Sequence, residues 1–264
     1  MAVALTIAGS DPSGGAGLQA DLKTFAAHGV YGTSVVTAVT AQSTQGVVDS
    51  FPLPADVVSA QLDALGGDIV VDATKTGMLG TSAIVEAVAA MIVSLDLPRV
   101  VVDPVLTATG GGNLLAPDAI STLKHELLRH AWVVTPNVPE AEILSGLPIR
   151  TLDDVKEAAE RIQRLGPRAV VIKGGHLAGS QAIDLLFDGE QMIEFPAPRL
   201  PGPPAHGTGC AFSAALAAGL ALGCSLPDAT ERAKRYVTGA LRHRLTIGQG
   251  APLLDHFWES RERS

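Results

Sequence analysis

Cysteines and aromatic residues are scarce in this sequence, and both scarcities limit the kind of fold it can adopt. The two cysteines, Cys210 and Cys224, form no CxxC pair and belong to no His/Cys cluster at metal-ligand spacing. This pattern argues against a structural zinc site and against a disulfide scaffold. Aromatic residues make up 4% of the chain, whereas alanine, valine, leucine and glycine are abundant. A core of small aliphatic side chains is typical of α/β proteins.

Excess positive charge and long apolar runs are also missing. The formal net charge is −8 and no basic stripe is present, which argues against nucleic-acid binding. A small anionic substrate stays compatible, because backbone amides can bind an anion locally. The longest apolar stretch, around residues 211–222, is too short and too interrupted to cross a bilayer. The first residues run into a strand-like segment without a basic region or a cleavage site, and we therefore expect a cytoplasmic protein.

Short β-branched runs alternate with amphipathic runs along the whole chain. Most of the strand-like runs are apolar at every position, as in parallel strands covered on both faces. The alternation predicts βαβ units and a single α/β domain over residues 1–264. The expected strands are Val3–Ala8, Ser34–Thr40, Ile69–Thr74, Val100–Asp103, Trp132–Thr135 and Ala169–Lys173. The expected helices are Ala16–His28, Ala55–Leu65, Ser82–Leu95, Pro117–Leu128, Pro139–Leu144, Leu152–Leu165, Thr208–Leu222 and Pro227–Leu245.

One segment departs from this alternation. The runs Ile183–Phe187 and Gln191–Phe195 flank Asp188-Gly189, which predicts a β-hairpin with a tight turn. We expect this hairpin at an edge of the sheet. Together these patterns predict a mostly parallel central sheet with helices on both faces. Thr151 and Asp154 are spaced like a capping box at the start of one of those helices.

The segment His206–Cys210 (HGTGC) carries the strongest local signal, because a helical run follows it at once. Gly207 and Gly209 let backbone amides turn toward a ligand, and Thr208 lies between them. The first turn of a helix adds unpaired N–H donors and a positive dipole end. The segment therefore predicts an anion hole suited to a phosphoryl group in transfer. A plain loop-to-helix turn is the alternative interpretation.

Cys210 stands in the first turn of that expected helix. A thiol at such a position can have its pKa lowered by the backbone amides. Its functional interpretation is a general base, or a polar guide, for an attacking hydroxyl. The alternative is a small residue that packs the start of the helix. Phosphoryl transfer depends on positioning more than on proton removal, so a weak base would suffice.

Further polar residues stand where strands are expected to end. A glycine-rich loop, Gly9–Gly17, directly follows the first strand, and it matches neither a Walker A motif nor a dinucleotide fingerprint. Ligands of open α/β sheets bind beyond the carboxyl ends of the strands. Carboxylates, an amide and a cation there would suit Mg²⁺ and phosphate. Each residue alone also reads as a loop residue or a helix cap. They are Gln42, Asp103, Asn137, Glu140 and Lys173.

Taken in order, these motifs resemble the hydroxymethylpyrimidine/phosphomethylpyrimidine kinases of thiamine biosynthesis. The resemblance runs from about residue 5 to about residue 245. It implies a ribokinase-like fold, a homodimer, ATP and Mg²⁺. It also implies two successive phosphorylations of 4-amino-5-hydroxymethyl-2-methylpyrimidine. The matching segments are Thr6–Gly17, Gln19–Phe25, Thr40–Gln42, Lys75–Leu79, Val102–Val105, Thr135–Ala141, Lys173–Leu177 and His206–Cys210.

The resemblance also implies roles for individual residues. Gln42 would bind the aminopyrimidine, since an amide donates and accepts at once. Asn137 and Glu140 would act on the Mg²⁺–phosphate shell through water, with Asp103 and Lys173 near the phosphates. The resemblance also implies which residues line the ring pocket and which form the anion hole. Asp21, Gly9 and Met78 would line the ring pocket, and Gly207, Thr208, Gly209 and Cys210 would form the anion hole.

The chain departs from the family pattern at one position that bears on function. Thr109 stands where the family usually has lysine. The second phosphorylation must hold an anionic substrate, so the sequence leaves that step open. A pyridoxal or pyridoxine kinase of the same fold is the main alternative, and Gln42 and Met78 favour the aminopyrimidine over it. A non-catalytic pyrimidine- or nucleotide-binding paralogue and a sugar kinase are further alternatives.

Overall fold

The computed structural model describes residues 1–106, 114–176 and 179–262. Within these residues the chain forms a nine-stranded sheet in the order β3-β2-β1-β4-β5-β6-β7-β8-β9. The six middle strands pair in parallel with one another; they are β2, β1, β4, β5, β6 and β7. At the two edges of the sheet, β3, β8 and β9 pair antiparallel. The strands are β1 (Val3–Ser10), β2 (Tyr31–Ser43), β3 (Gly46–Pro52), β4 (Ala73–Thr76), β5 (Val100–Val102), β6 (Val133–Val134), β7 (Ala169–Ile172), β8 (Gln181–Phe187) and β9 (Met192–Pro198).

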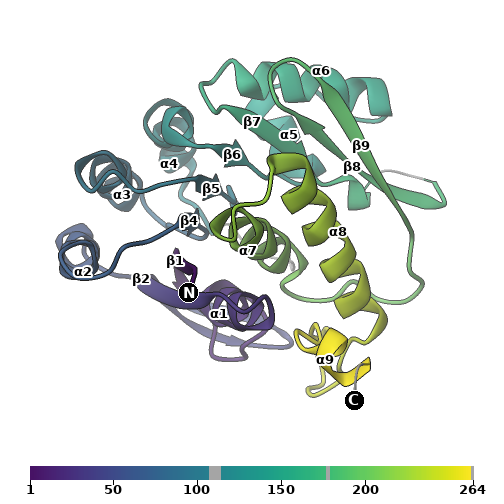
Figure 1. Cartoon of the computed structure of the whole chain (residues 1–264), viewed down its shortest axis with the longest axis horizontal. Helices are drawn as coiled ribbons and strands as arrows, with labels where there is room; N and C mark the ends of the chain where they lie inside the picture. The colour runs from purple at the N-terminus through teal and green to yellow at the C-terminus, as the bar shows by residue number, and fades with distance from the viewer. Residues whose placement is uncertain (107–113, 177–178, 263–264) are drawn as a thin grey trace.

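Helices cover both faces of this sheet and give the molecule three layers (Figure 1). One face carries α2 to α6, and the other carries α1, α7 and α8. The helices are α1 (Gly17–Ala27), α2 (Ala55–Gly66), α3 (Ser82–Ser94), α4 (Pro117–Thr122), α5 (Val138–Ser145), α6 (Leu152–Gln163), α7 (Thr208–Ala221), α8 (Leu226–Arg242) and α9 (Trp258–Glu262). The predicted three-layer α/β architecture with an edge hairpin is confirmed.

The middle strands show why their sequences are apolar throughout. In β5, Val101 packs into the core on one side of the sheet, whereas Val100 and Val102 pack into the core on the other side. In β6, Val133 and Val134 divide in the same way. Successive side chains of a strand point to opposite faces, so a strand covered on both faces needs an apolar side chain at every position.

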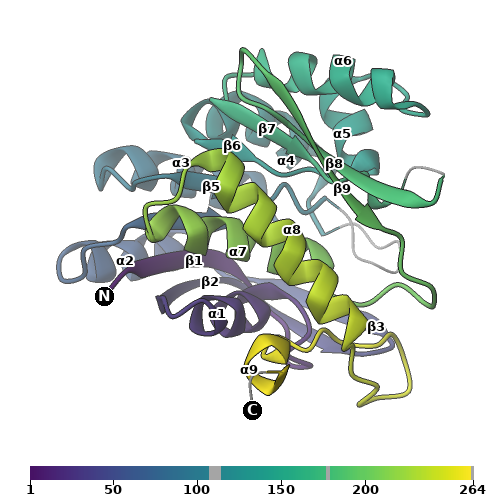
Figure 2. The same cartoon turned by 45° about the vertical axis from the view of Figure 1, so that its right-hand side comes forward.

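Helix α7 is buried between the sheet and α8 (Figure 2). Its sequence is rich in alanine, and every residue from Ala211 to Ala221 is buried. At Gly219 a Cβ atom would lie 3.0 Å from the Cβ of Ala229 on α8. Such small side chains let the helix axes approach closely. This packing fixes the start of α7, where the glycine motif lies, against the carboxyl ends of the strands.

Several predicted element boundaries are wrong. The strand expected at Ile69–Thr74 begins only at Ala73, and the side chain of Val70 is 85% exposed. The helix expected at Pro117–Leu128 ends as α4 at Thr122 and continues as a π-helical turn and a short 3-10 turn up to His130. This change keeps Leu123, Leu127 and Leu128 buried.

Two elements escaped the sequence analysis. Strand β3 pairs with β2 at the sheet edge, and its exposed Val48 and Phe51 blur the pattern of a half-buried strand. The short helix α9 buries none of its residues. In the confirmed β8–β9 hairpin, Phe187 pairs with Met192, and the Asp188 amide donates to the carbonyl oxygen of Gln191 across the turn. Among the described residues, no helix has the length and apolar character needed to cross a membrane.

Candidate active site

The start of α7 faces the carboxyl ends of the central parallel strands (Figure 2). Gly207 is the N-cap residue, with φ of 84°, and a Cβ atom there would overlap the carbonyl oxygen of Gly15. Glycine is therefore required for both its backbone angle and its space. The close approach joins the loop after β1 to the start of α7. The first-turn amides of Thr208, Gly209 and Cys210 have no partner within their own helix, which suits the predicted anion hole.

Lys173 and Asp103 lie beside this helix start. Nζ of Lys173 lies 2.9 Å from Oδ1 of Asp103, and Oγ of Ser213 donates to Oδ2 of Asp103 at 3.1 Å. A Cβ atom at Gly209 would lie 3.3 Å from Nζ of Lys173. Burial lowers the pKa of Lys173, but the carboxylates of Asp103 and Glu140 outweigh it and leave the pKa raised. The ammonium therefore stays charged next to the helix amides.

Asn137 and Glu140 form a capping box at the start of α5. Oδ1 of Asn137 accepts a hydrogen bond from the Glu140 amide at 2.9 Å. Oε2 of Glu140 accepts one from the Asn137 amide at 2.8 Å. Burial raises the pKa of Glu140, although the charge of Lys173 opposes the rise. The capping role and the predicted metal role thus fall on the same two side chains, and each retains acceptor capacity.

Cys210 lies in the first turn of α7, as predicted, but its expected ionisation is wrong. Burial raises the pKa of the thiol to about 11, and the nearby charge of Lys75 and a hydrogen bond from the Gly17 amide only partly oppose this. At neutral pH the side chain is therefore a neutral thiol. Loss of solvent outweighs the helix amides here, because an ion buried in protein loses its hydration.

Asp21 lies beneath the glycine-rich loop and is fully buried. Its Oδ2 accepts hydrogen bonds from Nζ of Lys75 at 2.8 Å and from Oγ1 of Thr6 at 2.6 Å. Its Oδ1 is buried without a partner among the described residues. Burial raises the pKa of Asp21 against the opposing charge of Lys75. Lys75 is also fully buried, and the carboxylates of Asp21 and Asp103 raise its pKa against the effect of burial.

The three predicted ring-binding residues lie near the ends of separate strands: Gly9 on β1, Met78 after β4 and Gln42 on β2. A Cβ atom at Gly9 would lie 3.1 Å from Sδ of Met78. The side chain of Gln42 contacts Thr40 at 3.1 Å and His206 at 2.8 Å. The structure thus brings these three predicted ring-binding residues to the edge of the sheet that also carries the anion hole. Thr109 lies outside the described residues.

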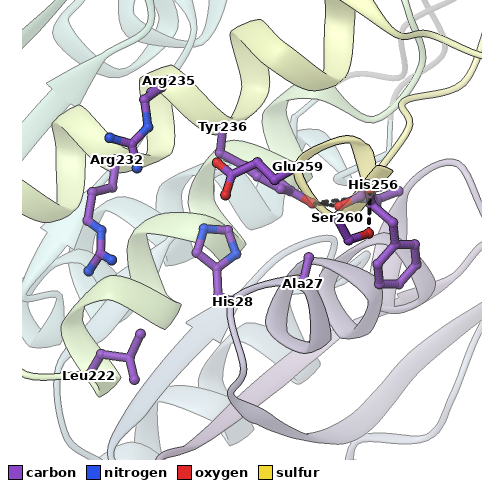
Figure 3. A pocket seen from close by; sticks show the side chains of 10 residues that line it. Ala27, His28, Leu222, Arg232, Arg235, Tyr236, His256, Glu259 and Ser260 are labelled. Atoms are coloured by element: carbon purple, nitrogen blue, oxygen red, sulfur yellow. Dashed lines mark hydrogen bonds between the residues drawn. The ribbon is translucent and has the colours of Figure 1, made fainter. Parts of the chain in front are cut away.

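A cavity of about 170 Å³ lies elsewhere, between the end of α1, the end of α7, α8 and α9 (Figure 3). It is lined by His28, Arg232, Arg235 and Tyr236, among others. Because α1 and α7 both begin at the candidate active site, this cavity lies at their opposite ends. Arg232 donates to Sγ of Cys224 at 3.0 Å. A cationic side chain is stabilised near the negative carboxyl end of a helix, here the end of α7. The arginines of the cavity therefore have a structural role that requires no ligand.

The sequence of the chain matches a known protein family. The sequence profile of phosphomethylpyrimidine kinase matches residues 11–255. The chain belongs to the phosphomethylpyrimidine kinase family. It is 49% identical to the hydroxymethylpyrimidine/phosphomethylpyrimidine kinase of Rhizobium meliloti (strain 1021) over 259 residues, which cover 97% of each chain. It is 48% identical over 253 residues to the thiamine biosynthesis bifunctional protein ThiED of Geobacter sulfurreducens, and it spans 52% of that protein.

Solved structures of similar proteins have the same fold as this member of the phosphomethylpyrimidine kinase family. A Bacillus subtilis pyridoxal kinase solved as an ADP complex superposes with a TM-score of 0.92 and 40% identity, over 99% of both chains. The phosphomethylpyrimidine kinase of Clostridium difficile 630 superposes with a TM-score of 0.82 and 40% identity, over 91% of this chain and all of that chain. The ribokinase-like fold expected from the sequence is confirmed.

Sequence reasoning assigned no role to three residues that shape the site of this phosphomethylpyrimidine kinase family member. Lys75 forms the buried ion pair with Asp21. Asp11 organises the glycine-rich loop by accepting from the amides of Ser13 and Ala16. His206 contacts both Asp11 and Gln42. A lysine directly after an expected strand was the available signal for Lys75. The partners of the other two residues are far apart in sequence.

Proposed function

We propose that this chain transfers the γ-phosphoryl group of ATP to the hydroxymethyl group of 4-amino-5-hydroxymethyl-2-methylpyrimidine, and then phosphorylates the monophosphate to the diphosphate. The observation that carries the proposal is the position of the α7 amides beside Lys173, on the same sheet edge as Gln42 and Met78. The relative from Rhizobium meliloti carries the name of this activity. Complexes of similar pyridoxal kinases with ADP and AMP-PCP support ATP as the donor.

The anion hole would act on the transferred phosphoryl group. The amides of Thr208, Gly209 and Cys210 are fixed by the burial of α7 and stabilise negative charge without moving. The charged side chain of Lys173 adds a cation on the same side. Because phosphoryl transfer has a loose transition state, placing these donors matters more than activating the nucleophile.

Cys210 would guide the substrate hydroxyl as a neutral thiol. Its pKa of about 11 means that almost no thiolate is present at neutral pH. The thiol sulfur can accept a hydrogen bond from the attacking hydroxyl as its oxygen approaches phosphorus. A hydroxyl proton leaves late in a loose transition state, so the thiol only has to orient the hydroxyl. The proton would then pass to an oxygen of the transferred phosphoryl group or to water.

Mg²⁺ would be held by Asn137 and Glu140 through water. Their oxygens are hard donors of the kind that Mg²⁺ takes. The single side-chain oxygen of Asn137 and Oε2 of Glu140 already serve the α5 capping box. The residues therefore fit contacts through water better than direct ligation. Asp103 adds a buried carboxylate at the same edge. When bound, the ion would offset the negative charge of the triphosphate.

Gln42, Gly9 and Met78 would form the ring pocket. The amide of Gln42 can donate to a ring nitrogen and accept from an exocyclic amine. The absence of a side chain at Gly9 leaves room for Met78, whose thioether can pack against a flat ring. Asp21 is buried below this surface, and we assign it to the pocket through its unpaired Oδ1.

A pyridoxal kinase activity is the second candidate. Pyridoxal kinases from Bacillus subtilis and Staphylococcus aureus superpose on the chain with TM-scores of 0.92 and 0.90. They share the fold, so the choice depends on the ring pocket. The amide at Gln42 matches an aminopyrimidine edge and is the feature that favours the first candidate.

The deciding experiment measures ADP release by the purified protein with Mg-ATP and hydroxymethylpyrimidine, with its monophosphate and pyridoxal in parallel. We expect turnover of both pyrimidines and slow turnover of pyridoxal. Turnover of the first pyrimidine alone would limit the proposal to one step, as the threonine at position 109 allows. Turnover of pyridoxal alone would replace the proposed substrate, and bound pyrimidine without ADP release would identify a non-catalytic binder.

The homodimer and the cytoplasmic location implied by the sequence are also proposals. Apolar side chains of Val39, Val48 and Phe51 are exposed on the β2–β3 edge, which supports contact with a second copy. Sedimentation equilibrium at micromolar concentration measures the assembly, and a monomer would contradict it. Cell fractionation measures the location, and recovery with membranes would contradict it.

A further inference from the structure

Three side chains from distant parts of the sequence form a hydrogen-bonded row beside the ring pocket. Nε2 of His206 lies 3.0 Å from Oδ2 of Asp11 and 2.8 Å from Nε2 of Gln42. Asp11 belongs to the loop after β1, Gln42 to β2, and His206 to the segment before α7. One ring nitrogen thus contacts a carboxylate and an amide at once. The protonation of that nitrogen decides which hydrogen bonds are possible.

The surroundings of Asp11 settle that protonation. Its two oxygens accept from the amides of Ser13 and Ala16 and from Oγ of Ser13, at distances from 2.7 to 2.9 Å. Burial alone would raise the pKa of Asp11, but the hydrogen bonds from His206, Ser13 and Ala16 outweigh it and leave the pKa lowered. The carboxylate is therefore an acceptor only. A hydrogen bond at 3.0 Å requires Nε2 of His206 to carry a proton.

A protonated Nε2 cannot accept from an N–H group of Gln42. The contact at 2.8 Å becomes a hydrogen bond only when the amide is turned over, which exchanges Oε1 and Nε2 without changing its shape. Nε2 of Gln42 then faces Oγ1 of Thr40, the neighbour at 3.1 Å. That hydroxyl donates to the carbonyl oxygen of Ser10 at 2.9 Å and keeps lone pairs to accept. The single N–H at Nε2 of His206 is then shared between Oδ2 of Asp11 and Oε1 of Gln42 as a three-centre hydrogen bond. The Gln42 amide in turn donates to Oγ1 of Thr40.

We propose that His206, held by Asp11, is a positioning residue that fixes the amide of Gln42 with its carbonyl oxygen toward the histidine. This proposal rests on the proposed function, in which Gln42 recognises the ring. The fixed amide keeps one N–H and one oxygen lone pair free of partners among the described residues. It therefore favours a substrate edge with one particular order of donor and acceptor. An amide free to turn over would accept either order.

The histidine ring is itself held in place. A Cβ atom at Gly15 would lie 2.7 Å from both Cδ2 of His206 and Cδ2 of Leu253, so the ring packs tightly there. The His206 amide donates to the carbonyl oxygen of Pro252 at 2.9 Å. The segment after α8 thus supports the residue that orients Gln42. Only 15% of the histidine side chain is exposed, so water competes little with these contacts.

The test compares two substrates in two variants. His206→Gln keeps a donor near the Nε2 position, whereas His206→Leu removes it. The substrates are hydroxymethylpyrimidine and its 4-oxo analogue, which reverses the order of donor and acceptor on the ring edge. We expect the wild type to prefer the amine by about 10²-fold or more in kcat/KM, the range for sites that hydrogen-bond a substrate group. His206→Leu should reduce this ratio about tenfold, and His206→Gln should keep it.

A purely structural role predicts a different result. It would lower kcat/KM for both substrates by the same factor and leave their ratio unchanged, which would overturn the proposal. Equal behaviour of His206→Gln and His206→Leu would overturn it too. His125→Leu, the same change at an exposed histidine bonded only locally to Ser121, is the matched control. The KM for ATP should stay unchanged in both His206 variants.

A second measurement is independent of the substrate. The ¹⁵N chemical shifts of the His206 ring in the ligand-free protein report which nitrogen carries the proton. We expect a protonated Nε2, and an unprotonated Nε2 would overturn the proposal even if the kinetics agreed. If the wild type turns over neither pyrimidine, the proposed function fails, whereas the ring measurement still decides the role of His206.

Discussion

Nζ of Lys173 lies 2.9 Å from Oδ1 of Asp103, although the two residues are 70 positions apart in the chain. Each directly follows a central strand, β7 and β5 respectively. The carboxyl ends of parallel strands meet at one edge of a sheet, so the fold itself brings the two charges together. The pair keeps the ammonium charged and directed at the start of α7, where an anionic group would replace part of its contact with the carboxylate.

Replacing Lys173 by glutamine should lower kcat about 10²–10³-fold, the loss typical for one donor to a transition-state charge. The change leaves the buried Asp103 without its cation and should also lower the free energy of unfolding. The double variant Lys173→Gln/Asp103→Asn should recover stability but not activity. Steady-state kinetics and urea unfolding measure the two effects. Full activity in the single variant would remove Lys173 from phosphate binding.

Cys210→Ala should lower kcat by up to about 10²-fold, the scale for a reacting group that loses its correct position. Fold and ligand binding should persist, because the thiol is a small packing group. With a pKa near 11, the thiol changes charge only well above neutral pH. The kcat of the wild type should therefore show no thiol ionisation between about pH 6 and 9. Kinetics, calorimetric binding and a pH series check these points, and an unchanged kcat would remove Cys210 from the mechanism.

Gln42→Ala should raise KM for the pyrimidine by the equivalent of about 1–3 kcal/mol, the scale for polar groups left without partners. The KM for ATP should stay within about twofold, because the amide lies on the ring side of the site. Steady-state titration of each substrate separates the two constants. The assignment of Gln42 to the ring fails if the KM for the pyrimidine does not change.

Gly209→Ala should lower activity without lowering stability. Alanine is favoured over glycine within a helix by about 1 kcal/mol, so the melting temperature should rise or stay equal. The added Cβ would lie 3.3 Å from Nζ of Lys173 and 3.8 Å from Oδ2 of Asp103, and it would narrow the anion hole. We expect kcat to fall about tenfold or more, as for a displaced phosphate contact. If the Gly209→Ala variant keeps wild-type kcat and wild-type stability, the space beside Gly209 is not used by the phosphoryl group.

His256 should make the unfolding free energy depend on pH. Burial lowers its pKa from 6.5 to about 4, with Lys23 adding to the effect and Asp255 opposing it. A lowered histidine pKa gives stability that is present above pH 6.5 and is lost as the pH falls toward 4. The loss amounts to about 3 kcal/mol, because each unit is worth about 1.4 kcal/mol. Urea unfolding from pH 7.5 to 4 measures it for the wild type and His256→Gln, and equal pH slopes in the two proteins would contradict it.

The sequence predicted those parts of the architecture in which the burial of a strand or helix directly sets its pattern of apolar side chains. The valines of β5 and β6 are apolar at every position because both faces of the sheet are covered, and that pattern is local. Strand β3 gave no comparable signal, since an edge strand can expose valine and phenylalanine. The start of α7 was also predictable, because glycines before a helical run have a specific backbone use.

The partners of the polar residues could not be predicted in the same way. The sequence placed Lys75 and Asp21 in motifs, yet their buried ion pair joins positions 54 apart. The contacts of His206 with Asp11 and Gln42 span 195 and 164 positions. Nothing local in the chain specifies such pairs, because they arise only when three separate segments pack together.

By itself, the sequence determined the α/β fold, the glycine motif at the start of α7 and the edge of the sheet where the polar residues gather. Periodicity and glycine placement act over a few residues, so they can be read without knowing the fold. Only the tertiary structure decided that the Cys210 thiol is neutral and that His206 contacts both Asp11 and Gln42. Protonation and hydrogen-bond polarity depend on the solvent and charges around a group, and those surroundings are created by packing.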